Sequence, residues 1–236
     1  MKALLFDCDG VLADTERDGH RVAFNEAFRR KGLTSAWGVE QYGRLLLIAG
    51  GKERMRGFFE AEGWPRQAED RDAFIRELHT LKTELYMEII AQGRLPVRPG
   101  VARVIDRAFE EGVRVAVCST SDARGVTLLA QAVLGGDRVS RFAGIFAGDI
   151  VSRKKPDPAV YLLAAERLSV DAGDCMVVED SRNGLLAAVG AGMHCIITKS
   201  CYTQEEDFRE ADAVVDDLGD PPDPHLTLED LRRLGG

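Results

Sequence analysis

The stretch "LLFDCDGVLADTE", residues 4–16, joins a short apolar run to a pair of acidic residues. Residues two apart in a β-strand point to the same face, so Asp7 and Asp9 would lie side by side where a buried strand ends. Two carboxylates held this close repel one another unless a cation or a proton joins them. The stretch therefore predicts a buried strand that leads into a functional site.

Similar apolar runs recur along the chain, with helical stretches between them. The runs are residues 3–6, 113–118, 144–148, 175–179, 194–198 and 211–215. Continuously apolar strands that alternate with helices are typical of a parallel sheet covered on both faces. One of the helices, "VARVIDRAFEEG" at 101–112, has an apolar stripe and stops at a glycine. We predict an α/β fold with a doubly wound, mostly parallel, Rossmann-like sheet.

One connection is much longer than the others. Residues 14–96 show helical periodicity and no strand pattern, with one helix that stops at Gly32 and another that stops at Gly93. We predict an α/β core over residues 1–13 and 97–236 and an inserted helical cap domain over residues 14–96. Both ends of the insert join the core near Asp7 and Asp9, a placement suited to a lid over an active site.

Composition narrows the classes of function. The chain has 236 residues, of which 45% are hydrophobic, and a formal net charge of -8, which argues against broad nucleic-acid or membrane binding. The apolar run at the N-terminus is too short for a signal peptide, so we expect a cytoplasmic protein. Five cysteines without CxxC spacing indicate reduced thiols. We expect a monomer.

Polar residues follow the strands at the edge of the sheet where ligands bind in this class of fold. Hard oxygen ligands without His or Cys favour Mg²⁺, and Mg²⁺ beside lysine and hydroxyl donors is typical of a phosphate site. An ionised aspartate there can attack phosphorus and form an acyl phosphate. The residues at these strand ends are Asp7, Asp9, Ser119, Thr120, Ser121, Lys154, Lys155, Glu179 and Asp180.

Each of these residues also has an ordinary structural interpretation. Ser119 to Ser121 could cap the following helix, Glu179 and Asp180 could form an N-cap pair, and Lys154 could be solvated. In the insert, Lys52, Arg54 and Arg56 could be the polar face of a helix, and His20 could lie on a helix surface. Packing inside the insert is the favoured interpretation of Trp37, Trp64 and Tyr42.

Four segments, "FDCDGVLADTE", "VCSTSD", "KKPDPAVYLLAA" and "VVEDSRNGLLAA", resemble in order the motifs of the haloacid dehalogenase-like superfamily of phosphotransferases. The resemblance implies that Asp7 is the nucleophile and that Asp9 is the general acid and base. It further implies that Ser119 and Lys155 hold the phosphoryl group. Mg²⁺ would be held by Asp7, Asp180 and the backbone carbonyl of Asp9, with Glu179 assisting. Val11 stands where the family more often has threonine.

Segments of the insert and of the C-terminal part resemble the CbbY-type sugar-phosphate phosphatases of carbon-fixing organisms. They are "DTERDGHRVAFNEAF", "AGGKERMRGFF" and "YTQEEDFREADAVVDDLGD". The resemblance implies removal of the 1-phosphate of xylulose 1,5-bisphosphate, an inhibitor of the Calvin-cycle enzyme Rubisco. Lys52 and Arg54, after Gly50 and Gly51, would bind the second phosphate, and Glu16 and His20 would contact sugar hydroxyls.

Two rival functions fit the same fold. A sugar phosphomutase, such as a β-phosphoglucomutase-like enzyme, differs only in how well it keeps water from the aspartyl phosphate. A receiver-like phospho-acceptor domain also places Asp and Mg²⁺ at strand ends, although it would leave the helical insert without a purpose.

Overall fold

The computed structural model describes residues 1–48 and 51–236. Gly50, which precedes the residues expected to bind the second phosphate, lies outside the described residues. The chain divides into two compact units. Met1–Asp14 together with Leu95–Gly236 form an α/β unit, and Thr15–Arg94 form a helical unit. In the described part of the helical unit the secondary structure is entirely helical.

A six-stranded sheet in the order β3-β2-β1-β4-β5-β6 is the centre of the α/β unit. Every pairing between neighbouring strands is parallel, which confirms the doubly wound prediction. The strand order reverses between β1 and β4, and such a switch point is where ligands bind in open parallel sheets. The strands are β1 (Ala3–Phe6), β2 (Arg114–Cys118), β3 (Gly144–Phe146), β4 (Cys175–Glu179), β5 (His194–Thr198) and β6 (Ala213–Val215).

Three strands are shorter than predicted. β2 begins at Arg114 instead of at residue 113, β3 ends at Phe146 instead of at 148, and β6 begins at Ala213 instead of at 211. After β3 the chain turns at Gly148, where φ is +71°. Before β6, the Asp212 side chain accepts a hydrogen bond from the amide of Cys195 at 2.7 Å. A carboxylate there takes the place of a strand carbonyl, so the ladder starts after Asp212, two residues later than predicted.

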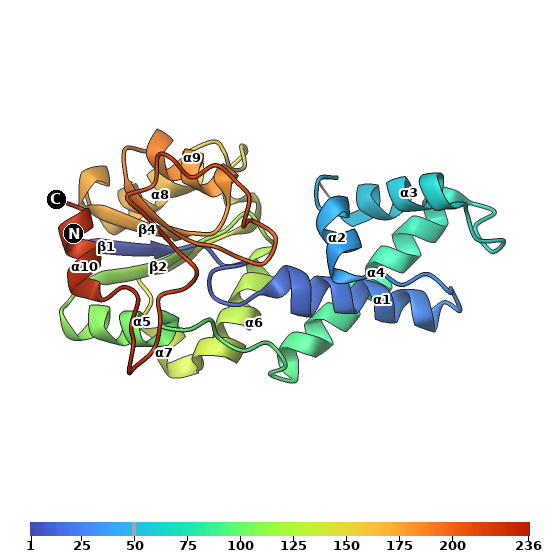
Figure 1. Cartoon of the computed structure of the whole chain (residues 1–236), viewed down its shortest axis with the longest axis horizontal. Helices are drawn as coiled ribbons and strands as arrows, with labels where there is room; N and C mark the ends of the chain where they lie inside the picture. The colour runs from blue at the N-terminus through green and yellow to red at the C-terminus, as the bar shows by residue number, and fades with distance from the viewer. Residues whose placement is uncertain (49–50) are drawn as a thin grey trace. The chain divides into compact units, whose positions relative to one another are not determined.

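Helices cover both faces of the sheet (Figure 1). On one side lie α8 (Ala159–Leu168) and α9 (Arg182–Gly190), which pack on apolar side chains of β1, β2, β4 and β5. On the other side lie α5 (Val101–Glu110), α6 (Ala123–Leu134) and α7 (Gly136–Ser140). All four residues of β1 are 0% exposed, so the strand that carries Asp7 is fixed in the core.

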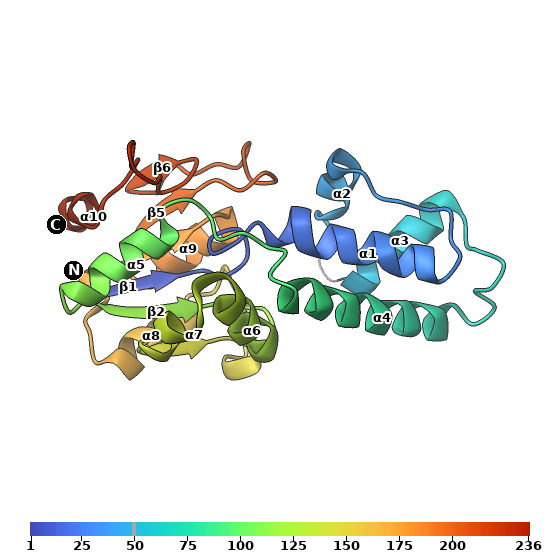
Figure 2. The same cartoon turned by 90° about the horizontal axis from the view of Figure 1, so that it is seen from below.

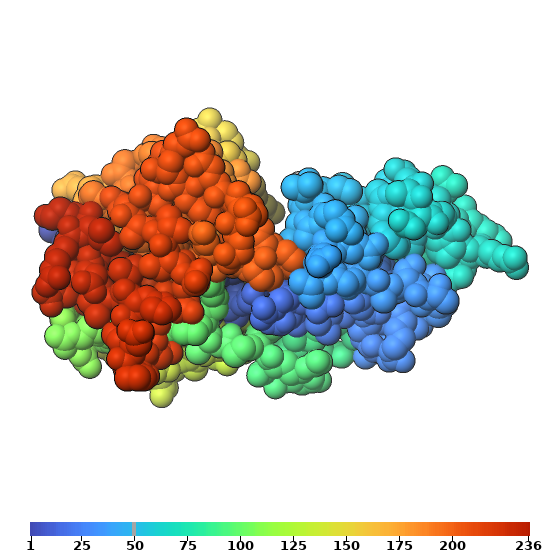
Figure 3. All heavy atoms as spheres, viewed as in Figure 1, coloured from blue at the N-terminus to red at the C-terminus, as the bar shows by residue number. Residues whose placement is uncertain are grey.

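The segment after β5 covers one face of the α/β unit, as the orange and red atoms show (Figure 3). It includes β6 and ends in α10 (Leu228–Leu234), which begins with a capping box at Thr227. The cysteines of the chain are free, as the sequence indicated, and Cys8, Cys118, Cys175 and Cys195 are buried.

The helical unit starts with a π-helical turn, η1 (Glu16–His20), that continues into α1 (Arg21–Arg30). It then contains α2 (Val39–Leu45), α3 (Gly51–Glu62) and α4 (Arg71–Ala91), and α1 packs along α4 (Figure 2). Trp37 and Tyr42 are buried among Phe24 and Phe28, which confirms the predicted packing role of Trp37 and Tyr42. In the described chain, no helix has the length and apolar character needed to cross a lipid bilayer.

Candidate active site

The switch point of the sheet places three carboxylates together. Asp7 directly follows β1, and its amide donates to the Val178 carbonyl at 2.9 Å, which extends the ladder one residue past the strand. Glu179 ends β4 and Asp180 follows it. One oxygen from each of these acids lies within 4.8 Å of the others, and all three residues are buried. The structure therefore brings together the acids that follow β1 and β4, as the sequence predicted.

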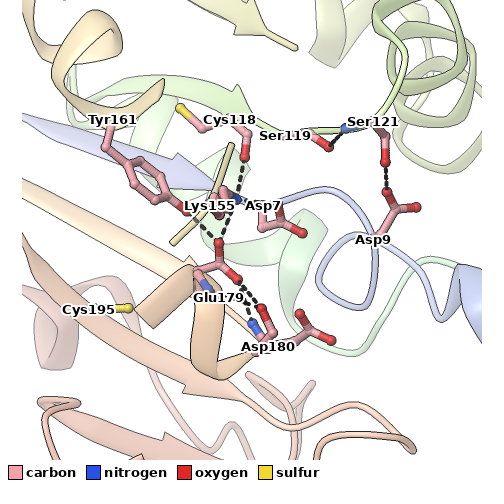
Figure 4. Close-up of polar contacts among 12 residues, drawn as sticks. Asp7, Asp9, Cys118, Ser119, Ser121, Lys155, Tyr161, Glu179, Asp180 and Cys195 are labelled. Carbon is pink, nitrogen blue, oxygen red and sulfur yellow. Dashed lines mark hydrogen bonds and ion pairs between the residues drawn. The ribbon is translucent and has the colours of Figure 1, made fainter. Parts of the chain in front are cut away.

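Lys155 joins two of these acids (Figure 4). Its Nζ lies 2.5 Å from Asp7 Oδ1 and 2.6 Å from Glu179 Oε1, and it also donates to the Cys118 carbonyl at 2.9 Å. Although burial alone would lower the pKa of Lys155, the Asp7 and Glu179 carboxylates raise it above its usual value. Lys155 is therefore a fixed ammonium group within the carboxylate cluster. Lys154, in contrast, pairs with exposed Asp149 at 2.9 Å.

The charges of this cluster fit a divalent cation. Ionising all three carboxylates would leave two negative charges beyond the one that Lys155 compensates, which is costly in a buried place. Burial, opposed by Lys155 and reinforced by the Glu179 and Asp9 carboxylates, raises the pKa of Asp7 to about 8. Burial, with Glu179 and Asp7, likewise raises the pKa of Asp180 well above its usual value. The oxygen ligands and the charge deficit suit an ion such as Mg²⁺.

Gly10 allows the turn after β1 to approach these acids. Its φ is +80°, and a Cβ there would lie 2.0 Å from Asp180 Oδ2. Only glycine combines this backbone conformation with so close an approach. Asp9, the next acid of the first motif, is oriented differently from Asp7. The Ser121 hydroxyl donates to Asp9 Oδ2 at 2.5 Å (Figure 4).

The hydroxyl residues after β2 form the other side of this rim. Ser119 is 3% exposed, its amide donates to the Phe146 carbonyl at 2.9 Å, and its Oγ accepts from the Ser121 amide at 3.1 Å. Thr120 lies between them and is half-buried. The helix cap that follows is made by Asp122, whose side chain accepts from the Gly125 amide. The N-cap interpretation of Ser119 to Ser121 is therefore wrong.

The N-cap interpretation of Glu179 and Asp180 is also wrong. The cap of α9 is Ser181, whose side chain accepts from the Gly184 amide. The role of the Asp9 backbone carbonyl as a metal ligand stays a prediction. The Asp9 carboxylate lies outside the group formed by Asp7, Glu179 and Asp180.

In the helical unit, Arg54 is buried rather than on a polar face of α3. It is 8% exposed, its Nε donates to the Leu45 carbonyl at 3.1 Å, and its Nη1 donates to the Tyr42 hydroxyl at 2.9 Å. The Tyr42 hydroxyl in turn donates to Glu16 Oε2 at 2.6 Å. Two predicted substrate residues, Glu16 and Arg54, are thus joined through Tyr42. The alternative of Arg54 as a solvated helix residue is wrong.

His20 contacts a lysine that the sequence interpretation missed. Lys82 Nζ of α4 lies 2.8 Å from His20 Nδ1, and the His20 ring lies 3.8 Å from the Tyr86 ring. Burial, followed by the charges of Lys82 and Arg54, lowers the pKa of His20 well below its usual value. His20 is therefore a neutral acceptor for the Lys82 ammonium group at neutral pH.

Further basic groups lie near this pair. Lys52 is exposed in the first turn of α3, after Gly51, where a Cβ would lie 3.1 Å from His79 Nε2. Burial and then the charges of Lys82 and Lys52 lower the pKa of His79. Arg56 pairs instead with Asp72. We call Lys52, Arg54 and Lys82 the cation cluster, and His20 and His79 lie beside it.

Three residues that contact these sites were missed by the sequence interpretation, although features of the sequence pointed to them. Lys82 occupies an apolar-stripe position of its helix, between buried Leu78 and Leu85. Tyr161 is 0% exposed and donates to Glu179 Oε1 at 2.6 Å, and it lies in the third motif. A Cβ at Gly184 would lie 1.9 Å from the Glu179 carboxyl carbon. A lysine within an apolar stripe and a glycine in a first helical turn are both unusual enough to point to such contacts.

The parallel sheet and the acids at its strand ends are features of a class of hydrolases. Residues 1–192 match the model of the haloacid dehalogenase-like hydrolases, and the chain belongs to that family. It is a hydrolase with a phosphatase activity. Its relatives in the family include proteins named CbbY. A CBBY-like protein of Arabidopsis thaliana is 54% identical over 96% of this chain and 72% of its own length.

Solved structures agree with this placement. CbbY from Rhodobacter sphaeroides in complex with phosphate has a TM-score of 0.78 and 40% identity, over 92% of this chain and 94% of that one. A mutant of the same protein in complex with xylulose-(1,5)bisphosphate gives the same values. A putative beta-phosphoglucomutase from Thermotoga maritima has a TM-score of 0.73 and 26% identity, over 91% of this chain and 94% of that one.

Proposed function

We propose that the chain is a Mg²⁺-dependent phosphatase that hydrolyses xylulose 1,5-bisphosphate to xylulose 5-phosphate and phosphate. The observation that carries the proposal is the similarity to CbbY, which has been crystallised with xylulose-(1,5)bisphosphate. The two units of this chain supply what a bisphosphate requires. The carboxylate rim is suited to the reacting phosphate, and the cation cluster is suited to a second anion.

The reaction that we propose starts at Asp7. Its carboxylate attacks phosphorus, and the sugar oxygen leaves as the aspartyl phosphate forms. Asp9 donates a proton to that oxygen and then accepts one from the water that attacks phosphorus, and the Asp7 carboxylate leaves as inorganic phosphate forms. Lys155 and Ser119 hold the phosphoryl oxygens, and Ser121 holds the Asp9 carboxylate through a 2.5 Å hydrogen bond. Mg²⁺, held by Asp7, Asp180 and the Asp9 carbonyl, would neutralise the negative charge of the acids and of the phosphate.

The test is phosphate release, with and without Mg²⁺, from a panel of sugar mono- and bisphosphates that includes xylulose and ribulose 1,5-bisphosphates. We expect a strong preference for the xylulose compound and loss of activity in a chelator. A flat profile, or activity on monophosphates alone, would contradict the substrate assignment and leave the phosphatase class intact.

A sugar phosphomutase is the second candidate, and the similarity to a putative beta-phosphoglucomutase is what favours it. A mutase and a phosphatase share the aspartyl phosphate and differ in whether water reaches it. Isomerisation of a hexose monophosphate without net release of phosphate would support the mutase.

A further inference from the structure

Arg98 lies in the return segment that enters the α/β unit, and it contacts both the turn after β1 and the ends of two strands. Its backbone amide donates to the Leu12 carbonyl at 2.9 Å, and its side chain donates to the Gly10 carbonyl. One residue thus binds two carbonyls of the same turn. That turn carries Asp9 and passes directly beside Asp180.

The same guanidinium also binds backbone carbonyls at the ends of β5 and β6. It donates to the Thr198 carbonyl at 3.1 Å, to the Lys199 carbonyl at 2.7 Å, and to the Asp216 carbonyl after β6. The Thr198 hydroxyl donates to the Glu179 carbonyl at 3.5 Å, so the end of β5 also contacts the residue before Asp180. The two segments that Arg98 holds therefore both lie beside Asp180: the Gly10 turn approaches its carboxylate, and the β5 end contacts the residue before it.

We infer that Arg98 is a positioning residue for the metal site: it holds the Gly10 turn and the β5 end at the separation that keeps the Asp180 carboxylate facing Asp7. The planar guanidinium is suited to this role because it offers five donors in a fixed geometry, which a lysine does not. Its positive charge would by itself weaken the binding of a cation. Loss of the positioning contacts should weaken cation binding, whereas loss of the positive charge should strengthen it, so an experiment can separate the two effects.

Arg103 is a matched control. Its side chain also donates hydrogen bonds to backbone carbonyls, those of Leu218 at 2.8 Å, Gly219 at 2.6 Å and Leu226 at 2.9 Å. None of these residues belongs to the carboxylate group of the rim. Replacing either arginine by methionine removes a comparable set of hydrogen bonds and keeps most of the apolar stem.

The experiment measures Mn²⁺ binding by electron paramagnetic resonance and Mg²⁺ binding by calorimetry, without substrate. We expect Arg98→Met to weaken both by about tenfold, as partners of metal ligands commonly do, and Arg103→Met to leave them unchanged. Arg98→Lys keeps the charge without the planar fork and should also weaken binding; it carries the test if Arg98→Met does not fold. Equal binding by wild type and Arg98→Met, or tighter binding by Arg98→Met, would overturn the inference.

This inference rests on the proposed metal site, and Asp180→Asn tests that site separately. If wild type and Asp180→Asn bind Mn²⁺ equally, the metal site itself is wrong and the inference fails with it. If Asp180→Asn loses binding and Arg98→Met does not, the metal site stands and only the role of Arg98 is refuted.

Discussion

The two units of the molecule each contain a buried tyrosine that donates to a glutamate at the same distance. Tyr161 donates to Glu179 at 2.6 Å in the α/β unit, and Tyr42 donates to Glu16 at 2.6 Å in the helical unit. Both tyrosines are 0% exposed. The same local hydrogen bond therefore serves two sites of opposite charge.

The surroundings of the two pairs differ in sign. Around Tyr161, acids outnumber cations, since Asp7, Glu179 and Asp180 face the single ammonium group of Lys155. Around Tyr42, basic residues gather, and Arg54 donates directly to the tyrosine oxygen. The first environment is incomplete without a cation, and the second is suited to an anion. Electrostatic environment, rather than the hydrogen bond itself, separates a reacting site from a binding site.

Removing the central acid of the α/β unit should have the largest effect. We expect Asp7→Asn to lower turnover by at least about 1,000-fold with every substrate, because an amide cannot become the acyl phosphate. Phosphate release and circular dichroism together check the loss of activity and the retained fold. Substantial remaining activity would show that another residue is the nucleophile.

The pH dependence of stability gives this variant a second measurement. Burial raises the pKa of Asp7 to about 8 from a usual 3.8, so the metal-free folded state holds a proton that the unfolded chain has released. Metal-free stability should therefore fall as pH rises between about 4 and about 8. The Asn variant lacks this group and should show a shallower slope in thermal unfolding. Equal slopes would mean that Asp7 does not contribute in this way.

A change in the cation cluster should give a smaller and more selective effect. Lys52→Ala removes an exposed charge from the first turn of α3, so we expect about a tenfold loss of kcat/KM with a bisphosphate and little change with a small aryl phosphate. Steady-state kinetics on both substrates check this.

Lys31→Ala is the control for Lys52→Ala. Lys31 belongs to the same unit and pairs with Glu77 at 2.9 Å, and its loss changes the net charge equally. Equal losses on both substrates for Lys52→Ala, or the same selective loss for Lys31→Ala, would remove Lys52 from an anion site.

The two units also differ in how much of each the sequence revealed. The rim of the α/β unit was predictable, because strand ends of a parallel sheet meet at one edge and the acids occupy consecutive motif positions. For the helical unit, the sequence predicted which residues would bind the substrate but not which of them would contact one another. Arg54 turns inward to Tyr42, and Lys82 reaches His20 from a helix more than sixty positions later in the chain, an encounter set by helix packing. Helical periodicity predicts which face is buried but not which polar groups meet there.

The smallest effect that we predict uses the two tyrosines as a pair. Tyr161→Phe removes one hydrogen bond to a carboxylate, which should lower the free energy of unfolding by about 1–2 kcal/mol. Tyr42→Phe also removes the hydrogen bond that the buried Arg54 donates, so its loss of stability should be larger. Their kinetic consequences should differ. Without the Tyr161 hydroxyl, Glu179 holds Lys155 less firmly, so kcat should fall about threefold with aryl phosphates and bisphosphates alike. Without the Tyr42 hydroxyl, Arg54 and Glu16 lose their link, so KM should rise about threefold with the bisphosphate alone. If both variants change kcat alike, the division between a reacting site and a binding site is wrong.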